Sequence, residues 1–198
     1  MRLTETIRLS RRRLPHWEVD GARYFITVRC ADSLPADVVA RLADVKQAMS
    51  RIPPGSVAFA DARREFFRSL DRHLDAGHGA CPLRYPDAAA IVVDELHQLT
   101  EWEIQAPHYS VMPNHWHAIL VPSDAKAHSL SSLMKRLKGR TARRIRQVVS
   151  GSGPFWQGEW FDRWIRDDAE WDRIVAYIRN NPVKAGLVQT WELHPFTK

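Results

Sequence analysis

The spacing of apolar positions along the chain changes between a two-residue period and a helical period. Residues 24–28 read Tyr-Phe-Ile-Thr-Val, a β-rich run that predicts a first strand. Residues 36–52 carry apolar side chains at helical spacing, and Pro53-Pro54-Gly55 follows as a stop. A second helix is predicted over residues 61–76, ended by Gly77.

The second half of the chain continues this alternation. A third helix is predicted after Pro86, where Asp87 can act as its N-cap and Val92, Leu96 and Leu99 share one face. The remaining predicted elements are a long strand over 108–121 interrupted at Pro113-Asn114, a helix over 129–149, an extended segment over 155–165, and a last helix that Asp168 caps and that runs to about Asn180.

Strands separated by helices predict one α+β domain over residues 1–198. The helices within 36–86 read as an insertion after the first strand, and residues 1–20 read as a basic, poorly patterned arm. The composition agrees with a globular chain, because 44% of its residues are hydrophobic and 26% are charged.

Composition also excludes several classes of protein. The two cysteines, Cys30 and Cys81, form no CxxC pattern, which argues against a disulfide framework and a cysteine-ligated zinc site. No run approaches the roughly 20 apolar residues of a membrane span, and the N-terminus lacks the apolar core of a signal peptide. We therefore expect a soluble, cytoplasmic protein with no membrane partner.

The charge is distributed unevenly. The chain has 29 Lys and Arg against 23 Asp and Glu, and the helix predicted over 129–149 carries a run of cations without an acid. Like charges four residues apart destabilise a helix unless a polyanion neutralises them. This favours contact with nucleic acid over an ordinary solvated face. The run comprises Lys135, Arg136, Lys138, Arg140, Arg143, Arg144 and Arg146.

Two histidines stand two residues apart in the strand predicted over 108–121. On a strand, His115 and His117 point to the same face, and Trp116 points to the opposite one. Two neighbouring imidazoles can bind one divalent cation. The alternative is a pair of half-buried histidines bonded to backbone carbonyls, and the pattern by itself leaves both open.

The last predicted helix contains a second polar pair. Its core stripe is formed by Trp171, Ile174, Val175 and Ile178, and Tyr177 lies off the centre of that stripe. Asn181 returns to nearly the same side one turn later. The alternative for Tyr177 is a boundary residue with its hydroxyl in water. The alternative for Asn181 is the N-cap of a short terminal helix that begins at Pro182.

Taken together, these segments resemble one family. The chain resembles the REP-associated tyrosine transposases, relatives of the single-tyrosine insertion-sequence transposases of the HUH class. Residues 36–86 carry no matching motif. The segments that carry the resemblance are, in chain order, LPHWEVDGARYFITVRCADSLP, YSVMPNHWHAILVP, SLSSLMKRLKGRTARRI, FWQGEWFDRWIRD and YIRNNPVKAGLV.

The resemblance implies a ferredoxin-like antiparallel sheet with packed helices, and a site that nicks single-stranded DNA. It assigns the metal to His115 and His117, the nucleophile to Tyr177 and a third ligand to Asn181. An open site of this kind suits Mg²⁺ or Mn²⁺. The residues expected to contact DNA are Lys135, Arg136, Lys138, Arg140, Arg143, Arg144 and Lys184.

The expected activity is metal-dependent nicking and strand transfer through a 5′-phosphotyrosine, on single-stranded or hairpin DNA from palindromic repeats. One alternative is a hairpin-binding protein with a vestigial metal site, and another is a phosphohydrolase that uses water. We expect a monomer or homodimer, with the site built within one chain. The sequence does not identify the group that takes the Tyr177 proton.

Overall fold

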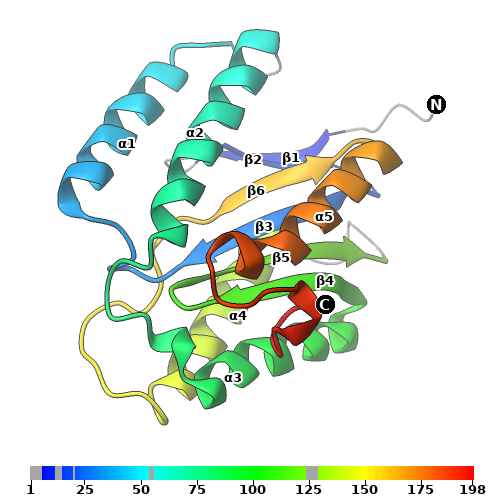
Figure 1. The fold of residues 1–198 in the computed structure, drawn as a ribbon. Helices are drawn as coiled ribbons and strands as arrows, with labels where there is room; N and C mark the ends of the chain where they lie inside the picture. The colour runs from blue at the N-terminus through cyan, green and yellow to red at the C-terminus, as the bar shows by residue number, and fades with distance from the viewer. Residues whose placement is uncertain (1–5, 12–14, 20, 54–55, 124–128) are drawn as a thin grey trace.

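A four-stranded antiparallel sheet organises the molecule (Figure 1). The computed structural model describes residues 6–11, 15–19, 21–53, 56–123 and 129–198. The strand order β4-β5-β3-β6 and the βαββαβ connectivity are those of a ferredoxin-like fold, which confirms the predicted α+β class. The four strands are β3 (Arg23–Arg29), β4 (Ile104–Met112), β5 (His115–Pro122) and β6 (Phe161–Ile165).

The long strand predicted over 108–121 is a hairpin of two strands. Met112 of β4 pairs with His115 of β5, so Pro113 and Asn114 form the turn between them. Proline has a fixed φ and no backbone N–H, and the chain therefore reverses here instead of continuing as one strand.

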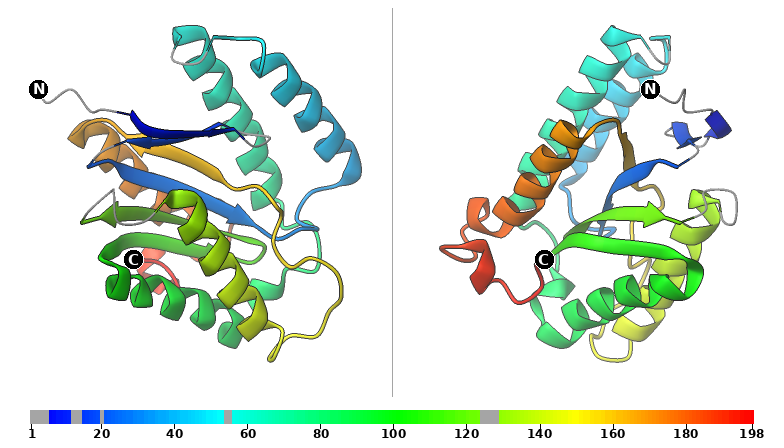
Figure 2. Two further views of the ribbon diagram at one scale, coloured as in Figure 1. Left: turned by 180° about the vertical axis from the view of Figure 1, so that it is seen from behind. Right: turned by 90° about the vertical axis from the view of Figure 1, so that its right-hand side faces the viewer.

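Helices cover both faces of the sheet (Figure 2). The helices α3 (Pro86–His97) and α4 (Leu130–Ile145) pack on one face, against a core that includes Trp116, Ala118 and Leu120 of β5. Ile119 belongs to a second apolar cluster with α5 (Asp168–Lys184) on the other face. Strand alternation therefore directs the odd-numbered residues of β5, the two histidines among them, toward α5.

Two helices occupy most of the 36–86 region. They are α1 (Ala36–Met49) and α2 (Val57–Asp75), and α2 starts before the predicted residue 61 because the Ser56 hydroxyl accepts a hydrogen bond from the Phe59 amide at 3.1 Å. Of the predicted stop, Pro54 and Gly55 lie outside the described residues. The two helices share an apolar cluster formed by Leu34, Val38, Leu42, Met49, Phe59, Phe66, Leu70 and Leu74.

Two predicted helix starts were wrong by one or two residues. In α3 the first helical residue is Pro86, preceded by Tyr85, and Asp87 lies in the first turn instead of capping it. Proline suits that position because its missing N–H would have no helical partner there. In α5 the cap is Asp167, whose carboxylate accepts from the Glu170 amide at 2.7 Å, and not Asp168.

Two predicted ends also differ. The helix predicted over 129–149 stops at Ile145, and the extended segment predicted over 155–165 forms a strand only over Phe161–Ile165. The last helix passes Asn180 and continues through Pro182 to Lys184, so Asn181 does not cap a separate helix. Pro182 lies in the last turn and therefore costs only one helical hydrogen bond. Gly186, at φ 70°, ends the helix.

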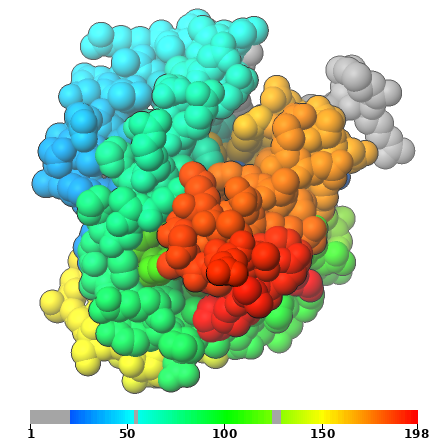
Figure 3. All heavy atoms as spheres, viewed as in Figure 1, coloured from blue at the N-terminus to red at the C-terminus, as the bar shows by residue number. Residues whose placement is uncertain are grey.

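The two ends of the chain add short elements. Within residues 1–20, strands β1 (Thr6–Arg11) and β2 (Pro15–Val19) pair in antiparallel fashion, so this segment is more regular than the expected arm. Past α5, which is orange in Figure 3, the red C-terminal residues run back to the edge of β4, where Thr197 pairs with Ser110. Short 3₁₀ helices span Pro82–Arg84, Gln98–Trp102 and Trp191–Leu193. None of the described helices is long and apolar enough to cross a membrane.

A buried carboxylate links β6 to the start of α5. Glu170, only 2% exposed, accepts hydrogen bonds from the side chain of Arg163 and from the backbone and side chain of Arg166. Burial by itself would raise the pKa of Glu170. The hydrogen bonds from Arg166 and the charge of Arg163 outweigh it and lower the pKa below 4.5.

We expect Glu170→Gln to reduce the free energy of unfolding by about 2–3 kcal/mol at pH 7, because two arginines lose a buried anionic partner. A lowered carboxyl pKa stabilises the fold above the unfolded-state value and loses that effect as the pH falls through the folded-state value. The difference between wild type and variant should therefore shrink below pH 4.5. Urea unfolding measured across pH tests this, and equal midpoints at pH 7 would refute it.

Candidate active site

The two histidines of β5 lie side by side beneath α5. His115 and His117 are both fully buried, and their ring centroids are 4.8 Å apart. Neither ring is half exposed, and the hydrogen bonds of both Nδ1 atoms go to side chains instead of backbone carbonyls. The pair therefore differs from the alternative of half-buried histidines bonded to backbone carbonyls.

Neighbouring side chains orient both imidazoles. Asn114 donates from its amide nitrogen to the backbone oxygen of His78 at 3.0 Å, which turns its amide oxygen toward His115. His115 Nδ1 donates to that oxygen at 2.7 Å, so its Nε2 carries the lone pair. His117 Nδ1 lies 2.8 Å from the Thr27 hydroxyl. Among the described residues, His115 Nε2 has no hydrogen-bond partner.

Burial keeps both imidazoles neutral. It lowers the pKa of His115 well below 6.5, and the neighbouring His117 lowers it further. Burial, helped by the charge of Lys184, lowers the pKa of His117 to about 3. Neutral imidazoles hold free lone pairs at physiological pH, which is the state that binds a metal.

Asp71 of α2 completes a buried cluster with the two histidines. Its carboxylate is nearly inaccessible, and its Oδ1 lies 3.7 Å from His117 Nε2. The candidate ligand atoms of Asp71, His115 and His117 all lie within 4.8 Å of one another. Two neutral imidazoles and one carboxylate are the donor set of a divalent metal site.

Tyr177 of α5 lies directly against this cluster. Its hydroxyl donates a hydrogen bond to Asp71 Oδ1 and lies 3.3 Å from His117 Nε2. Phe25 and Phe67 contact the ring edge-on, with centroids at 5.7 and 6.0 Å. Burial and the charge of Asp71 raise the pKa of Tyr177 well above 10. The hydroxyl therefore keeps its proton until a neighbouring group takes it.

Lys184, predicted to contact DNA, points into the same cluster. Its ammonium donates to Asp71 Oδ2 at 2.8 Å and lies 2.6 Å from the Asp75 carboxylate. Burial would lower the pKa of Lys184, but its bonds to the two carboxylates outweigh this and raise it. In this structure Lys184 neutralises the acid that holds the Tyr177 hydroxyl.

Asn181, predicted as the third metal ligand, follows Tyr177 by one helical turn. Its side chain is 1% exposed, and within the described parts of the chain its amide atoms make no hydrogen bond. A buried amide without partners costs roughly 1–3 kcal/mol, so such a group suits a ligand position. The assignment stays a prediction.

The hydrogen bond from His115 to Asn114 gives a testable expectation. Asn114→Ala should weaken binding of Mn²⁺ by roughly 10- to 100-fold, because the imidazole loses the partner that fixes its tautomer and orientation. Titration calorimetry measures the affinity. Asn180→Ala, an exchange of the same kind on α5 away from the histidines, is the control. Unchanged Mn²⁺ affinity in the Asn114 variant would contradict the tautomer argument.

The basic helix α4 lies on the opposite face of the sheet from this cluster, and α3 supplies the acids that its own sequence lacks. Arg140 pairs with Glu95 at 2.7 Å, and Arg144 pairs with Asp94 and Glu95 at 2.5 and 2.8 Å. The repulsion inferred from the sequence is therefore offset within the chain.

Two more cations of the run also have partners in the chain. Lys138 donates to the backbone oxygens of Gln157 and Gly158, and the Arg136 guanidinium lies 3.6 Å from the centre of the Trp102 ring. Lys135 and Arg143 face solvent. DNA contact through this helix stays a prediction.

Asp71 was not among the site residues predicted from the sequence. It belongs to the 36–86 region, which carries no motif, and it lies 106 residues from Tyr177 in the chain. One signal was available. Asp71 follows Phe67 by four residues and precedes Leu74 by three, so an acid interrupts the apolar stripe of a helix. Buried carboxylates are rare without a partner, and such a position marks a candidate site.

The comparison with protein families addresses the histidine–tyrosine part of the site. Residues 89–181 match the model of the family described as IS200-like transposase. Over these residues, just under half of its length, the chain is similar to IS200-like transposases. The match includes His115, His117, Tyr177 and Asn181. It begins at residue 89 and therefore does not include Asp71. The resemblance found in the sequence is confirmed, and the match supports a DNA-processing role in transposition.

Solved structures add evidence on the fold of this chain. A REP-associated tyrosine transposase bound to a REP hairpin matches 95% of this chain and 81% of its own, with a TM-score of 0.52 and 15% identity. That likeness shows a shared fold. A structure described as a transposase from Deinococcus radiodurans R1 matches 80% of this chain and 89% of its own, with a TM-score of 0.38 and 16% identity. No curated protein matches the sequence significantly.

Proposed function

We propose that this protein cleaves and rejoins single-stranded DNA, with Tyr177 as the nucleophile and a divalent cation at the histidine cluster. One observation carries the proposal: the Tyr177 hydroxyl lies 3.3 Å from a neutral buried histidine and is hydrogen-bonded to the Asp71 carboxylate. A phenol, a proton acceptor and a metal-binding pair thus meet at one point.

The polar groups of the site account for the proton. Asp71 takes the proton of the Tyr177 hydroxyl, and the phenolate oxygen attacks the phosphorus of the DNA backbone. A bond from Tyr177 to phosphorus forms, the bond from phosphorus to the 3′ oxygen breaks, and that oxygen takes a proton from water. The products are a 5′-phosphotyrosine and a free 3′-hydroxyl. Rejoining reverses these steps, so no nucleotide cofactor is needed.

The residues present fit a divalent cation. His115 and His117 would hold it with a carboxylate oxygen of Asp71, and Asn181 supplies a further buried amide oxygen. A bound Mg²⁺ or Mn²⁺ would offset the negative charge that develops at the scissile phosphate. Lys184 holds the Asp71 carboxylate in place by donating a hydrogen bond to its Oδ2.

Hairpin DNA is the proposed substrate. The support is the fold shared with a REP-associated transposase bound to a REP hairpin, together with the net positive charge of the chain. Tyr177 and both histidines come together within a single chain, which supports a site built in cis in a monomer or in each subunit of a homodimer.

The role of Asp71 in proton transfer can be tested by one exchange. Asp71→Asn keeps an oxygen at the same place but removes the proton acceptor, so the rate of adduct formation should fall by roughly 10²- to 10⁴-fold. Asp75→Asn, on the same helix and also paired with Lys184, is the control and should keep most of the rate. Single-turnover gel assays measure both. Equal rates in wild type and Asp71→Asn would remove Asp71 from the mechanism.

The proposed function is tested by incubating the protein with end-labelled hairpin oligonucleotides and Mg²⁺ or Mn²⁺. The proposal predicts a covalent protein–DNA adduct that depends on the divalent cation. A hairpin-binding protein with a vestigial site would shift the DNA without an adduct. A phosphohydrolase using water would release cleaved DNA without one, so either result overturns the proposal.

A further inference from the structure

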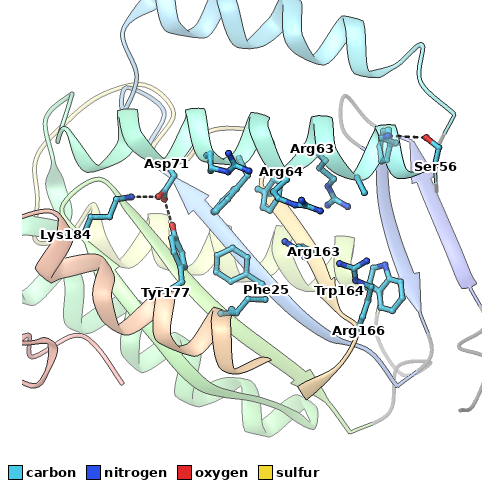
Figure 4. A pocket seen from close by; sticks show the side chains of 16 residues that line it. Phe25, Ser56, Arg63, Arg64, Asp71, Arg163, Trp164, Arg166, Tyr177 and Lys184 are labelled. Atoms are coloured by element: carbon cyan, nitrogen blue, oxygen red, sulfur yellow. Dashed lines mark hydrogen bonds and ion pairs between the residues drawn. The ribbon is translucent and has the colours of Figure 1, made fainter. Parts of the chain in front are cut away.

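A groove of about 570 Å³ begins at the catalytic cluster and runs between α2, β6 and α5. Figure 4 shows Tyr177, Asp71 and Lys184 together at one end, and Ser56, Trp164 and Arg166 at the other. We propose that this groove, called the α2 groove below, holds the single strand that continues from the phosphate at Tyr177. The inference rests on the proposed function and adds a strand-binding site to it.

The walls of the α2 groove are strongly positive. Asp71 is the one carboxylate among the residues that line it, and it lies at the catalytic end. A narrow cleft lined by one sign of charge concentrates the opposite charge, here the phosphates of a nucleic acid. The lining cations are Arg63, Arg64, Arg68, Arg163, Arg166 and Lys184.

The partners of these arginines leave them able to meet phosphates. Arg64 and Arg68 pair with Asp61 and Glu65 on the exposed side of α2, and their side chains stay 50% and 63% exposed. Surface pairs of this kind contribute about 0–1 kcal/mol, so exchange for a phosphate costs little. Arg163 and Arg166 form ion pairs with Glu170, which does not line the groove.

Aromatic side chains line the same groove. The Phe67 ring stacks on Phe161 at a centroid distance of 4.5 Å and also contacts Tyr177 edge-on. Phe67 and Trp164 both line the groove and are partly exposed. Arginines interleaved with aromatic rings form the usual surface for unpaired bases, which stack on the rings while the backbone meets the cations. The lining aromatics are Phe25, Phe59, Phe67, Phe161, Trp164 and Tyr177.

The geometry favours a single strand over a duplex. The rings lie inside the groove with the cations, and the bases of a duplex are already stacked on each other and cannot reach them. From Phe59 to Asp71, α2 rises about 18 Å at about 1.5 Å per residue. At a phosphate spacing of about 3.4 Å, this length holds roughly five stacked nucleotides.

The proposal gives the helices of the 36–86 region a role. Phe59, Arg63, Phe67 and Asp71 recur every four residues along α2, so one side of this helix forms a continuous wall that ends at Tyr177. The other side of α2 packs on α1 through Phe66, Leu70 and Leu74. α1 thereby supports the wall without lining it.

The test measures binding of DNA hairpins with single-stranded tails of 0 to 10 nucleotides by Tyr177→Phe protein, which cannot cleave them. The groove variant is Arg64→Gln with Arg68→Gln. The matched control is Arg41→Gln with Arg72→Gln, which also removes two charges from α1 and α2 but outside the groove. Fluorescence anisotropy gives the affinity at several salt concentrations.

We expect affinity to rise with tail length up to about five nucleotides and then level off. The salt slope is the change in log affinity with log salt concentration, and it is negative. For tailed hairpins, the groove variant should reduce its magnitude by about 1.4, which is about 0.7 for each lost phosphate contact. The control variant should leave that slope unchanged. Trp164→Leu should weaken tail binding roughly fivefold or more.

Two outcomes would overturn the α2 groove as the strand site. One is an equal loss of slope in groove and control variants. The other is an effect of the groove variant on blunt hairpins as large as on tailed ones, which would assign the arginines to a duplex. These binding readouts need no cleavage. Failure of adduct formation with intact tail binding would therefore reject the proposed function and leave the strand site standing.

Discussion

Tyr177→Phe is expected to reduce formation of the covalent DNA adduct below detection while the protein still binds hairpin DNA. The exchange removes one oxygen, the atom proposed to attack phosphorus, and leaves the ring against Phe25 and Phe67. Asp71 loses one hydrogen bond but keeps Lys184 at 2.8 Å, so the cost in stability is about 1 kcal/mol. Denaturing gels with end-labelled DNA measure the adduct, and thermal unfolding measures the stability.

A second tyrosine provides the control. Tyr109 is also buried, its hydroxyl lies 3.1 Å from His97 Nε2, and it belongs to the core on the other face of the sheet. Tyr109→Phe should lose a comparable hydrogen bond and keep full adduct formation. An adduct in the Tyr177→Phe protein would defeat the nucleophile assignment.

Replacing both histidines of β5 is the second large effect. His115→Ala with His117→Ala should lower the rate of divalent-dependent cleavage at least about a hundredfold, because the site loses both neutral imidazole ligands and the charge compensation they support. Hairpin affinity measured without divalent cation should stay within about twofold, since the histidines are fully buried and do not line the groove. Cleavage rates across a Mn²⁺ titration test this expectation.

The control for the histidine pair is His97→Ala, which removes an imidazole from the α3 side of the sheet. Unchanged cleavage in the double variant would reject the metal site. Mixing the double variant with Tyr177→Phe protein examines subunit arrangement. A site built within one chain predicts no activity in the mixture, and recovered activity would show a site shared between subunits.

The sequence predicted those parts of the site that depend on local periodicity. His115 and His117 share a face because strand side chains alternate, and Tyr177 and Asn181 are one turn apart because helical side chains recur every three to four residues. Both relations are local, so they do not depend on where the strand and the helix pack in the fold. The end of the first helix before Pro53 and the order of strands and helices followed from similar local signals.

The contributions of α2 depend on tertiary packing and could not be predicted in this way. Asp71 reaches Tyr177 across 106 residues, and nothing in its own neighbourhood indicates which strand α2 will lie beside. For the same reason, the sequence could not show that the acid-free run of α4 is compensated by Glu95 and Asp94 from α3. The cations that line the groove come from α2, from β6 and the residue after it, and from the end of α5, and they form only short runs in the sequence.

The measurement that tests the central claim most directly is the identity of the residue bound to DNA. After trapping on a hairpin oligonucleotide with Mn²⁺, nuclease and trypsin digestion should leave a nucleotide on the peptide Ile174–Arg179, which trypsin releases by cutting after Arg173 and Arg179. Tyr177 carries the one hydroxyl side chain of that peptide. The account predicts a phosphotyrosine-linked nucleotide at Tyr177 by mass spectrometry, and a linkage on any other peptide would contradict it.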